Sequence, residues 1–386
     1  MPVSSKEKKR RRVPRAVLVI FYLAAAAYIV ATVMAGGTPP GFARLSGVIF
    51  STSDDVTQVG EYRFNVGRSR VFADMDGKLA AAGTLGIQVL DADGSETLRD
   101  SFFMQSPAIV SAGVRAVAFD IGGFELRVFD GAEIIAAVQK DNEIVSASIN
   151  QNGWVAVTTQ PGEGYGGLVT IYDDSGRPAF RFFSGDGYVL SALVSPDDRD
   201  KALLRLTDYG SQVAVFRLGT DNALRTLDLP GGIIIDIRYM PNGNIFALST
   251  DALLLLERNG RSRELFSFSD RRLGGFAFDD GGFIALHLLD YGVGYHGRIV
   301  TLRENGNVIE ELVFNREVIS MSAADGYLAV LWPGGLMFYD SGLNEFPPYE
   351  ADIVIAGASR VVAFSGGMAL AAGDYSAAVL EIDRTP

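Results

Sequence analysis

The sequence contains no cysteine and only two histidines, His287 and His296, in 386 residues. The absence of cysteine excludes disulfides, thiolate metal sites and cysteine nucleophiles. Two imidazoles facing each other across one loop could bind a metal with help from Asp290, but polar positions at a loop edge explain them more simply. No Ser–His–Asp constellation can be singled out, because serine and aspartate are abundant enough to match by chance. The sequence therefore predicts no catalytic residue, no metal site and no cofactor.

Basic residues are concentrated at the N-terminus. Residues 1–15 hold seven lysines and arginines against one acid, Glu7, which gives this segment a charge of +6. The whole chain carries −12, so the remaining residues carry −18. Nucleic-acid binding needs clustered lysine and arginine facing the phosphates. The acidic body of the chain therefore argues against a nucleic-acid partner.

One long apolar run follows the basic segment. Residues 16–37 contain no charged side chain, and about 20 helical residues cross a bilayer core. The run predicts a transmembrane helix, and the basic flank predicts that the N-terminus is cytoplasmic and the rest of the chain is outside. A cleaved signal peptide is the alternative, with Val33 and Ala35 as small residues before the cut, but the run exceeds the usual apolar length. Residues 1–15 form a cytoplasmic stub that sets orientation and contacts anionic lipid, or alternatively binds a cytoplasmic partner.

From about Val66 the sequence repeats a unit of four short apolar segments separated by glycine-containing turns. Units begin near Ala108, Glu143, Tyr188, Ile233, Arg272 and Glu317, at spacings of 35, 45, 45, 39 and 45 residues. Periods of about 40–45 residues with four strands indicate the blades of a β-propeller. The second segment of a unit is continuously apolar, as in 245–248 and 328–331, which is typical of a strand covered on both faces. A β-sandwich or a β-helix would not repeat this pattern.

Seven full units end near Glu350, and an eighth at the C-terminus has only three segments. We expect Gln58–Asn65 to supply its missing strand, because a strand from each terminus removes the free edge of the ring. The sequence thus predicts an all-β propeller of eight four-stranded blades, with seven as the alternative. The expected organisation is stub 1–15, transmembrane helix 16–37, linker 38–46 and ectodomain 47–386.

The two faces of such a propeller should differ. Turns between the first and second strands, and between the third and fourth, contain Asp-Gly or Asn-Gly pairs such as Asp76-Gly77, which favour tight hairpins. The connections between the second and third strands lie on the opposite face, and we expect them to be longer and to carry aromatic residues. This predicts a binding face formed by Tyr165, Asp208, Tyr209, Asp290, Tyr291, Tyr295, His296, Trp332, Asp374 and Tyr375.

Simple turn chemistry is the alternative explanation for these Asp-Tyr-Gly loops. Tyrosine nevertheless suits a binding surface, since it combines apolar area with a polar tip. Because Gln58–Asn65 would begin on the short-turn side, we expect that side to lean toward the membrane and the tyrosine side to point away from it.

The basic segment KEKKRRR, the apolar run and the repeats together resemble an uncharacterised family of bacterial single-pass membrane proteins. The resemblance implies a membrane-anchored propeller similar to WD40 and quinoprotein domains, of unknown function. Quinoprotein dehydrogenases carry a regular tryptophan motif, whereas this chain has only Trp154 and Trp332, which speaks against their quinone cofactor. No blade shows the Gly-His and Trp-Asp pairs of WD40 proteins proper.

Two functions are compatible with these observations. The first is a non-enzymatic scaffold of the cell envelope that binds a protein or an envelope polymer on the tyrosine-bearing face. The second is a lyase or hydrolase that acts on a cell-surface glycan in the propeller channel, an idea that rests on fold analogy. The second function requires carboxylates or histidines that converge at the channel. A sensor that signals inward is a third possibility, but the stub is too short for a signalling domain.

Overall fold

The computed structural model describes residues 56–382 except 161–163, 280–281, 293, 334, 346–357, 365–366 and 374–375. The chain divides into two units, Met1–Ser53 and Asp54–Pro386, and all described residues belong to the second. The predicted stub, transmembrane helix and linker therefore lie outside the described residues. Within the described part, no helix has the length and hydropathy of a membrane span.

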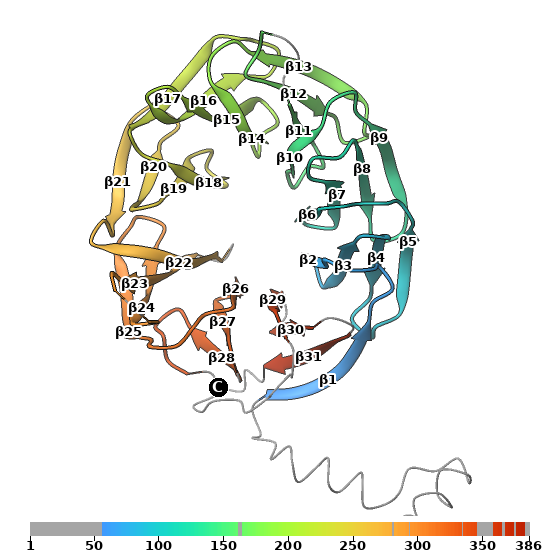
Figure 1. Cartoon of the computed structure of the whole chain (residues 1–386), viewed down its shortest axis with the longest axis vertical. Coiled ribbons are helices and arrows are strands. Elements are labelled where there is room, and N and C mark those ends of the chain that lie inside the picture. Colours follow the sequence, from blue (N-terminus) through green and yellow to red (C-terminus); the bar gives the residue numbers. More distant parts are fainter. Residues whose placement is uncertain are drawn as a thin grey trace, which may run out of the picture. The chain divides into compact units, whose positions relative to one another are not determined.

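The described residues form 31 strands in eight antiparallel sheets that surround one axis (Figure 1). Each sheet is a blade, and successive strands of a blade run from the axis outward. The predicted eight-bladed, all-β propeller is confirmed, and the alternative of seven blades is wrong.

The first four blades each contain four consecutive strands. Blade 1 comprises β2 (Val71–Met75), β3 (Lys78–Gly83), β4 (Gly86–Leu90) and β5 (Glu96–Asp100). Blade 2 comprises β6 (Pro107–Ala112), β7 (Arg115–Asp120), β8 (Glu125–Asp130) and β9 (Ile134–Gln139). Blade 3 comprises β10 (Ile144–Ile149), β11 (Val155–Thr159), β12 (Gly167–Tyr172) and β13 (Pro178–Ser184). Blade 4 comprises β14 (Tyr188–Val194), β15 (Asp200–Thr207), β16 (Gly210–Arg217) and β17 (Ala223–Pro230).

The second half of the ring continues the pattern. Blade 5 comprises β18 (Ile234–Tyr239), β19 (Ile245–Ser249), β20 (Ala252–Leu256) and β21 (Ser262–Ser267). Blade 6 comprises β22 (Arg271–Phe278), β23 (Phe283–Asp290), β24 (Gly297–Arg303) and β25 (Val308–Val313). In blade 7 the described residues form β26 (Ser320–Ala324), β27 (Tyr327–Trp332) and β28 (Gly335–Asp340). Blade 8 comprises β29 (Arg360–Phe364), β30 (Met368–Ala372), β31 (Ser376–Ile382) and, from the other end of the chain, β1 (Val56–Arg63).

Strand β1 closes the ring, as predicted. It is the outermost strand of blade 8 and pairs antiparallel with β31, with Val56 opposite Ile382 and Arg63 opposite Ser376 (Figure 1). The strand begins and ends two residues earlier than the predicted Gln58–Asn65. Pairing with β1 leaves β31 without an open edge, which a free chain could otherwise use to aggregate.

Eight separate hydrophobic clusters hold the blades together, one at each junction between neighbouring blades. Strand β3 shows why its apolar run is continuous. Leu79 and Ala81 pack toward blade 8, whereas Ala80 and Ala82 pack toward blade 2. Alternate side chains point to opposite faces of a strand, so a blade between two neighbours needs apolar residues at every position.

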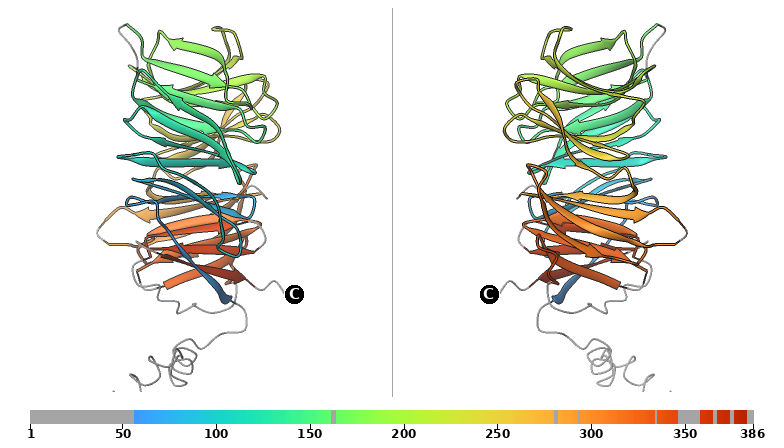
Figure 2. Two further views of the ribbon diagram at one scale, coloured as in Figure 1. Left: turned by 90° about the vertical axis from the view of Figure 1, so that its right-hand side faces the viewer. Right: turned by 90° about the vertical axis from the view of Figure 1, so that its left-hand side faces the viewer.

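The ring has two faces (Figure 2). The turn face carries the connections from the first to the second strand and from the third to the fourth strand of each blade. The loop face carries the connections from the second to the third strand and those between blades. On the turn face, Asp76-Gly77 and Asp325-Gly326 have positive φ at both residues, from 51° to 87°, as two-residue hairpins require.

Candidate binding face

The connections between second and third strands are not consistently longer than the turns of the opposite face, which corrects the expectation that they are longer. Two residues link β3 to β4 and β19 to β20, whereas five link β18 to β19 on the turn face. The connections between second and third strands span residues 160–166 in blade 3 and 291–296 in blade 6, but only Asp208 and Tyr209 link β15 to β16. The Thr207 hydroxyl donates to the Gly210 carbonyl at 2.9 Å and fixes this tight turn. The turn presents Tyr209 at its tip, with 83% of the residue exposed.

The described tyrosines of the predicted site all reach the surface of the loop face. Tyr165, Tyr291 and Tyr295 are 49%, 71% and 49% exposed. The ring of Tyr165 lies 5.1 Å from the ring of Phe183. The Tyr295 hydroxyl donates to Glu317, and this hydrogen bond and the charge of the carboxylate raise the Tyr295 pKa. The tyrosines occupy three different blades and do not form one cluster.

The other predicted site residues have varied environments. Asp208 and His296 are exposed, whereas the Asp290 carboxylate is paired with Arg271 at 2.7 Å. Trp332 was expected on the surface but is buried, 8% exposed, in the cluster between blades 6 and 7, with the Arg316 guanidinium over its ring. Asp374 and Tyr375 lie outside the described residues.

The two histidines do not face each other. In the β23–β24 ladder His287 lies opposite Ile299, while the amide of Asp290 donates to the carbonyl of His296. His287 is 2% exposed, and neither ring nitrogen has a hydrogen-bond partner among the described residues. Burial, aided by the charge of Arg272, lowers the His287 pKa to about 4. Within the described residues no group of three His, Asp or Glu side chains could hold a metal ion.

Exposed apolar side chains gather on the loop face. Of the twenty large apolar residues that the described part leaves exposed, sixteen lie in loop-face connections or at the strand ends beside them. These sixteen are Leu85, Phe103, Ile121, Phe124, Tyr165, Phe183, Tyr188, Leu190, Leu206, Tyr209, Ile233, Ile235, Tyr291, Tyr295, Val313 and Ile319. Most of them were missed at the sequence level, because apolar residues beside a strand read as core. The sequence pattern that could have identified them is an apolar residue next to a glycine-rich connection, as in Gly231-Gly232-Ile233.

The turn face uses its polar groups to join neighbouring blades. Arg258 of blade 5 pairs with Asp197 of blade 4 at 2.6 Å. The Asn152 amide of blade 3 donates to the Asp198 carboxylate of blade 4 at 2.9 Å. Only Val114, Leu224 and Val308 are exposed large apolar residues on this face of the described chain.

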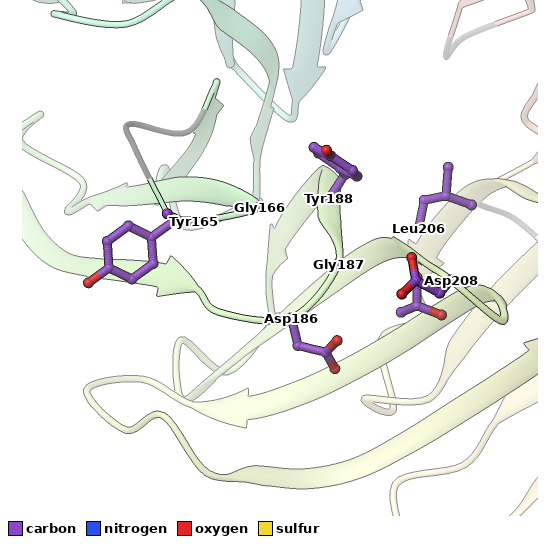
Figure 3. A pocket seen from close by; sticks show the side chains of 9 residues that line it. Tyr165, Gly166, Asp186, Gly187, Tyr188, Leu206 and Asp208 are labelled. Atoms are coloured by element: carbon purple, nitrogen blue, oxygen red, sulfur yellow. The ribbon is translucent and has the colours of Figure 1, made fainter.

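A hollow of about 440 Å³ opens on the loop face between blades 3 and 4 (Figure 3). The hollow is lined by Gly164, Tyr165, Gly166, Asp186, Gly187, Tyr188, Leu206, Thr207 and Asp208. The two chain segments at its base pack closely, since a Cβ on Gly166 would lie 1.9 Å from the Gly187 carbonyl oxygen. Glycines therefore allow this close packing, and aromatic and acidic side chains form the walls.

A smaller hollow of about 190 Å³ lies among the inner strands β18, β22 and β26. Arg238, Phe276, Phe278, Met321 and Ser322 line it, together with two alanines. The lining residues of this hollow include no carboxylate and no histidine. The inner strand β18 also carries Asp236, and burial raises the pKa of its carboxyl group.

The fold and the surface define an eight-bladed β-propeller whose exposed large apolar side chains lie mostly on one face. The chain belongs to a family of unknown function, DUF5711, whose model matches residues 51–335. No curated protein matches the sequence.

Several solved structures are similar in fold. One is Sqt1 of Saccharomyces cerevisiae, with a TM-score of 0.60 and 13% identity over 84% of this chain and 98% of that chain. Another is BamB of Moraxella catarrhalis, with a TM-score of 0.54 and 14% identity over 85% and 100% of the two chains. A third is the C-terminal WD40 domain of Sif2, with a TM-score of 0.57 and 12% identity over 85% of this chain and 99% of that chain. At these identities the similarity concerns the propeller fold alone.

Proposed function

We propose that this protein is a membrane-anchored scaffold that holds a β-propeller outside the cytoplasm and captures a protein partner on the loop face. One observation carries the proposal, namely that sixteen of twenty exposed large apolar side chains lie on that face. Exposed apolar side chains mark interaction sites where they gather, and this bias between the two faces favours the loop face as the surface that binds a partner.

The composition of the loop face also suits a protein interface. Tyrosine is enriched among the residues that dominate binding energy. Fully burying one such side chain contributes roughly 1.5–3 kcal/mol. A partner that covers Tyr209 and its aliphatic neighbours Ile233 and Ile235 would therefore gain enough for specific association. The turn face lacks this potential, because its charged groups already join neighbouring blades.

The anchor is supported by the uncharged run at residues 16–37 and the basic residues before it. Strand β1 begins at the turn face, where Val56 pairs with Ile382. The chain therefore enters the propeller on that side.

The topology is tested with the full chain tagged at either end. We expect protease added to intact cells to remove a C-terminal tag and to spare an N-terminal tag, and detergent to expose both tags. Protection of the C-terminal tag, with accessible envelope proteins digested, would contradict an extracytoplasmic propeller.

Partner capture is tested by crosslinking in intact membranes, followed by purification of the full chain. We expect Tyr209→Ala combined with Tyr291→Ala to lower the yield of the captured protein about tenfold, because each removes an exposed anchor. The matched control combines Val114→Ala with Leu224→Ala, which are similarly exposed on the turn face at 58% and 50%. Equal capture by the tyrosine pair and the parent chain would remove the loop face from consideration.

A further inference from the structure

The hollow between blades 3 and 4 is acidic, and its charge is only partly offset, because Asp186 interacts with the charge of the buried Arg205. The carboxylates of Asp186 and Asp208 stand at its edge (Figure 3), are exposed, and take part in no hydrogen bond or ion pair among the described residues. Their position is notable because the surrounding body of the chain is itself acidic. A neutral occupant would bury these charges without full compensation, which is costly.

The backbone beneath both carboxylates is held in place. The Ser184 hydroxyl and the Arg205 guanidinium donate to the Asp186 carbonyl oxygen, at 2.8 and 3.2 Å. Asp208 follows Thr207, whose hydroxyl closes the tight turn onto Gly210. Both carboxylates are therefore presented on fixed backbone, which lowers the entropic cost of binding.

Arg205 offsets part of this charge, since its guanidinium interacts electrostatically with Asp186. Arg205 is 8% exposed, and besides the Asp186 carbonyl its guanidinium bonds the Gln212 side chain. Gln212 in turn donates to the Asp228 carboxylate. One buried arginine thus interacts with both Asp186 and Asp228, and Asp208 adds a further negative charge at the hollow.

The walls favour an organic cation. Tyr188, 63% exposed, offers an aromatic ring and Leu206 an aliphatic surface. The Tyr165 ring points away from them (Figure 3) and lies 5.1 Å from the ring of Phe183. Cations bind over aromatic faces, and the aliphatic stems of arginine and lysine pack on apolar surface. A bare metal ion fits less well, because no group of three metal-ligating side chains exists among the described residues. The volume of about 440 Å³ exceeds the needs of a single ion.

We propose that this hollow receives an arginine or lysine side chain of the protein partner, with the carboxylates of Asp186 and Asp208 facing the cationic head and Tyr188 contacting the stem. The assignment rests on the proposed function and names the chemistry of the partner. The exposed Ile233 and Ile235, which border the next blade junction, then receive apolar residues that neighbour the basic one.

The test uses the full chain in detergent and two synthetic peptides, Gly-Leu-Arg-Leu-Gly and the same peptide with neutral citrulline in place of arginine. We expect the arginine peptide to bind at least about tenfold more tightly, since an ion pair in a partly desolvated site is worth that much. Asp186→Asn combined with Asp208→Asn should abolish this difference and leave binding of the citrulline peptide unchanged. Asp174→Asn combined with Glu304→Gln removes the same charge from the turn face and should preserve the difference.

Equal affinity for the two peptides, or no saturable binding of the arginine peptide at millimolar concentration, would overturn the proposal. Binding of chitotriose in preference to the arginine peptide would also overturn it and would indicate a sugar polymer. In the crosslinking assay, a partner that the Tyr209→Ala/Tyr291→Ala variant fails to capture but the Asp186→Asn/Asp208→Asn variant still captures would contradict this inference alone. A partner that both variants capture would contradict the proposed function as well.

Discussion

The hydroxyl of Tyr62 in the closing strand shares its one proton between two carbonyl oxygens of blade 1, Ala92 at 2.8 Å and Asp91 at 3.0 Å. Tyr62 is 5% exposed and belongs to the hydrophobic cluster between blades 8 and 1. The first described strand therefore holds the ring closed in two ways, through the ladder with β31 and through a side chain that reaches the next blade.

We expect Tyr62→Phe to lower the free energy of unfolding of the full chain by roughly 0.5–1.5 kcal/mol, since the hydrogen bond to the turn of blade 1 is lost. Tyr62→Ala should cost about 3–5 kcal/mol because it also empties part of the cluster. Denaturant unfolding measures both. Tyr165→Phe removes an exposed hydroxyl and should change stability by less than about 0.5 kcal/mol. Equal stabilities of Tyr62→Phe and the parent would show that the hydroxyl contributes nothing.

Removal of the closing strand should have a second effect besides lost stability. A chain that begins at Val66 leaves the edge of β31 unpaired, and unpaired edges recruit strands from other molecules. We expect this variant to melt at a lower temperature than a chain that begins at Asp54, and to self-associate. Light scattering and thermal unfolding of the two chains measure these effects. A monomeric variant with unchanged melting would mean that β1 is dispensable.

Much of the fold followed from the sequence because it depends on local patterns. Asp-Gly pairs fix their hairpins through the backbone alone, and runs such as 245–248 are apolar because both faces of β19 are covered. Even the pairing of β1 with the C-terminal blade was predictable, since a three-stranded remainder required one more strand.

The binding face was less predictable because exposure depends on contacts between distant segments. Trp332 looked like a loop aromatic, but it is the last residue of β27 and belongs to the same buried cluster as Met337 and Phe314. Conversely, Ile235 looked like core, yet it lies at a bulge of the inner strand β18 and is 44% exposed. A bulge shifts the register of a strand by one residue, and no local sequence pattern predicted this bulge.

His287 should make stability depend on pH. Its pKa falls from 6.5 to about 4 in the folded state, mainly through burial. The unfolded chain therefore binds the proton more readily, and stability is fully present above pH 6.5 and declines as the pH falls toward 4. We expect a loss on the order of 3 kcal/mol over this range. His287→Leu should abolish this contribution to the dependence of the free energy of unfolding on pH. Denaturant unfolding between pH 4 and 7 measures it.

His296 provides the matched control for this pH dependence. It is the other histidine of the chain and is exposed, so His296→Leu should leave the slope unchanged. Carboxylates also titrate in this range, and the difference between the two variants isolates the buried imidazole. Identical pH profiles for His287→Leu and His296→Leu would contradict the prediction.

Gly274 and His287 should be energetically coupled. Gly274 is the bulged residue of β22, and a Cβ there would lie 2.7 Å from Nδ1 of the buried His287 ring. We expect Gly274→Ala to destabilise the protein by about 1–3 kcal/mol through overpacking. Combined with His287→Ala, which vacates that space, the same change should cost less, with a coupling energy of roughly 0.5–3 kcal/mol.

Gly185→Ala, where nothing lies within 4 Å of the added Cβ, is the control and should be near neutral. Additive effects of Gly274→Ala and His287→Ala in denaturant unfolding would show that the ring tolerates the new methyl group without strain.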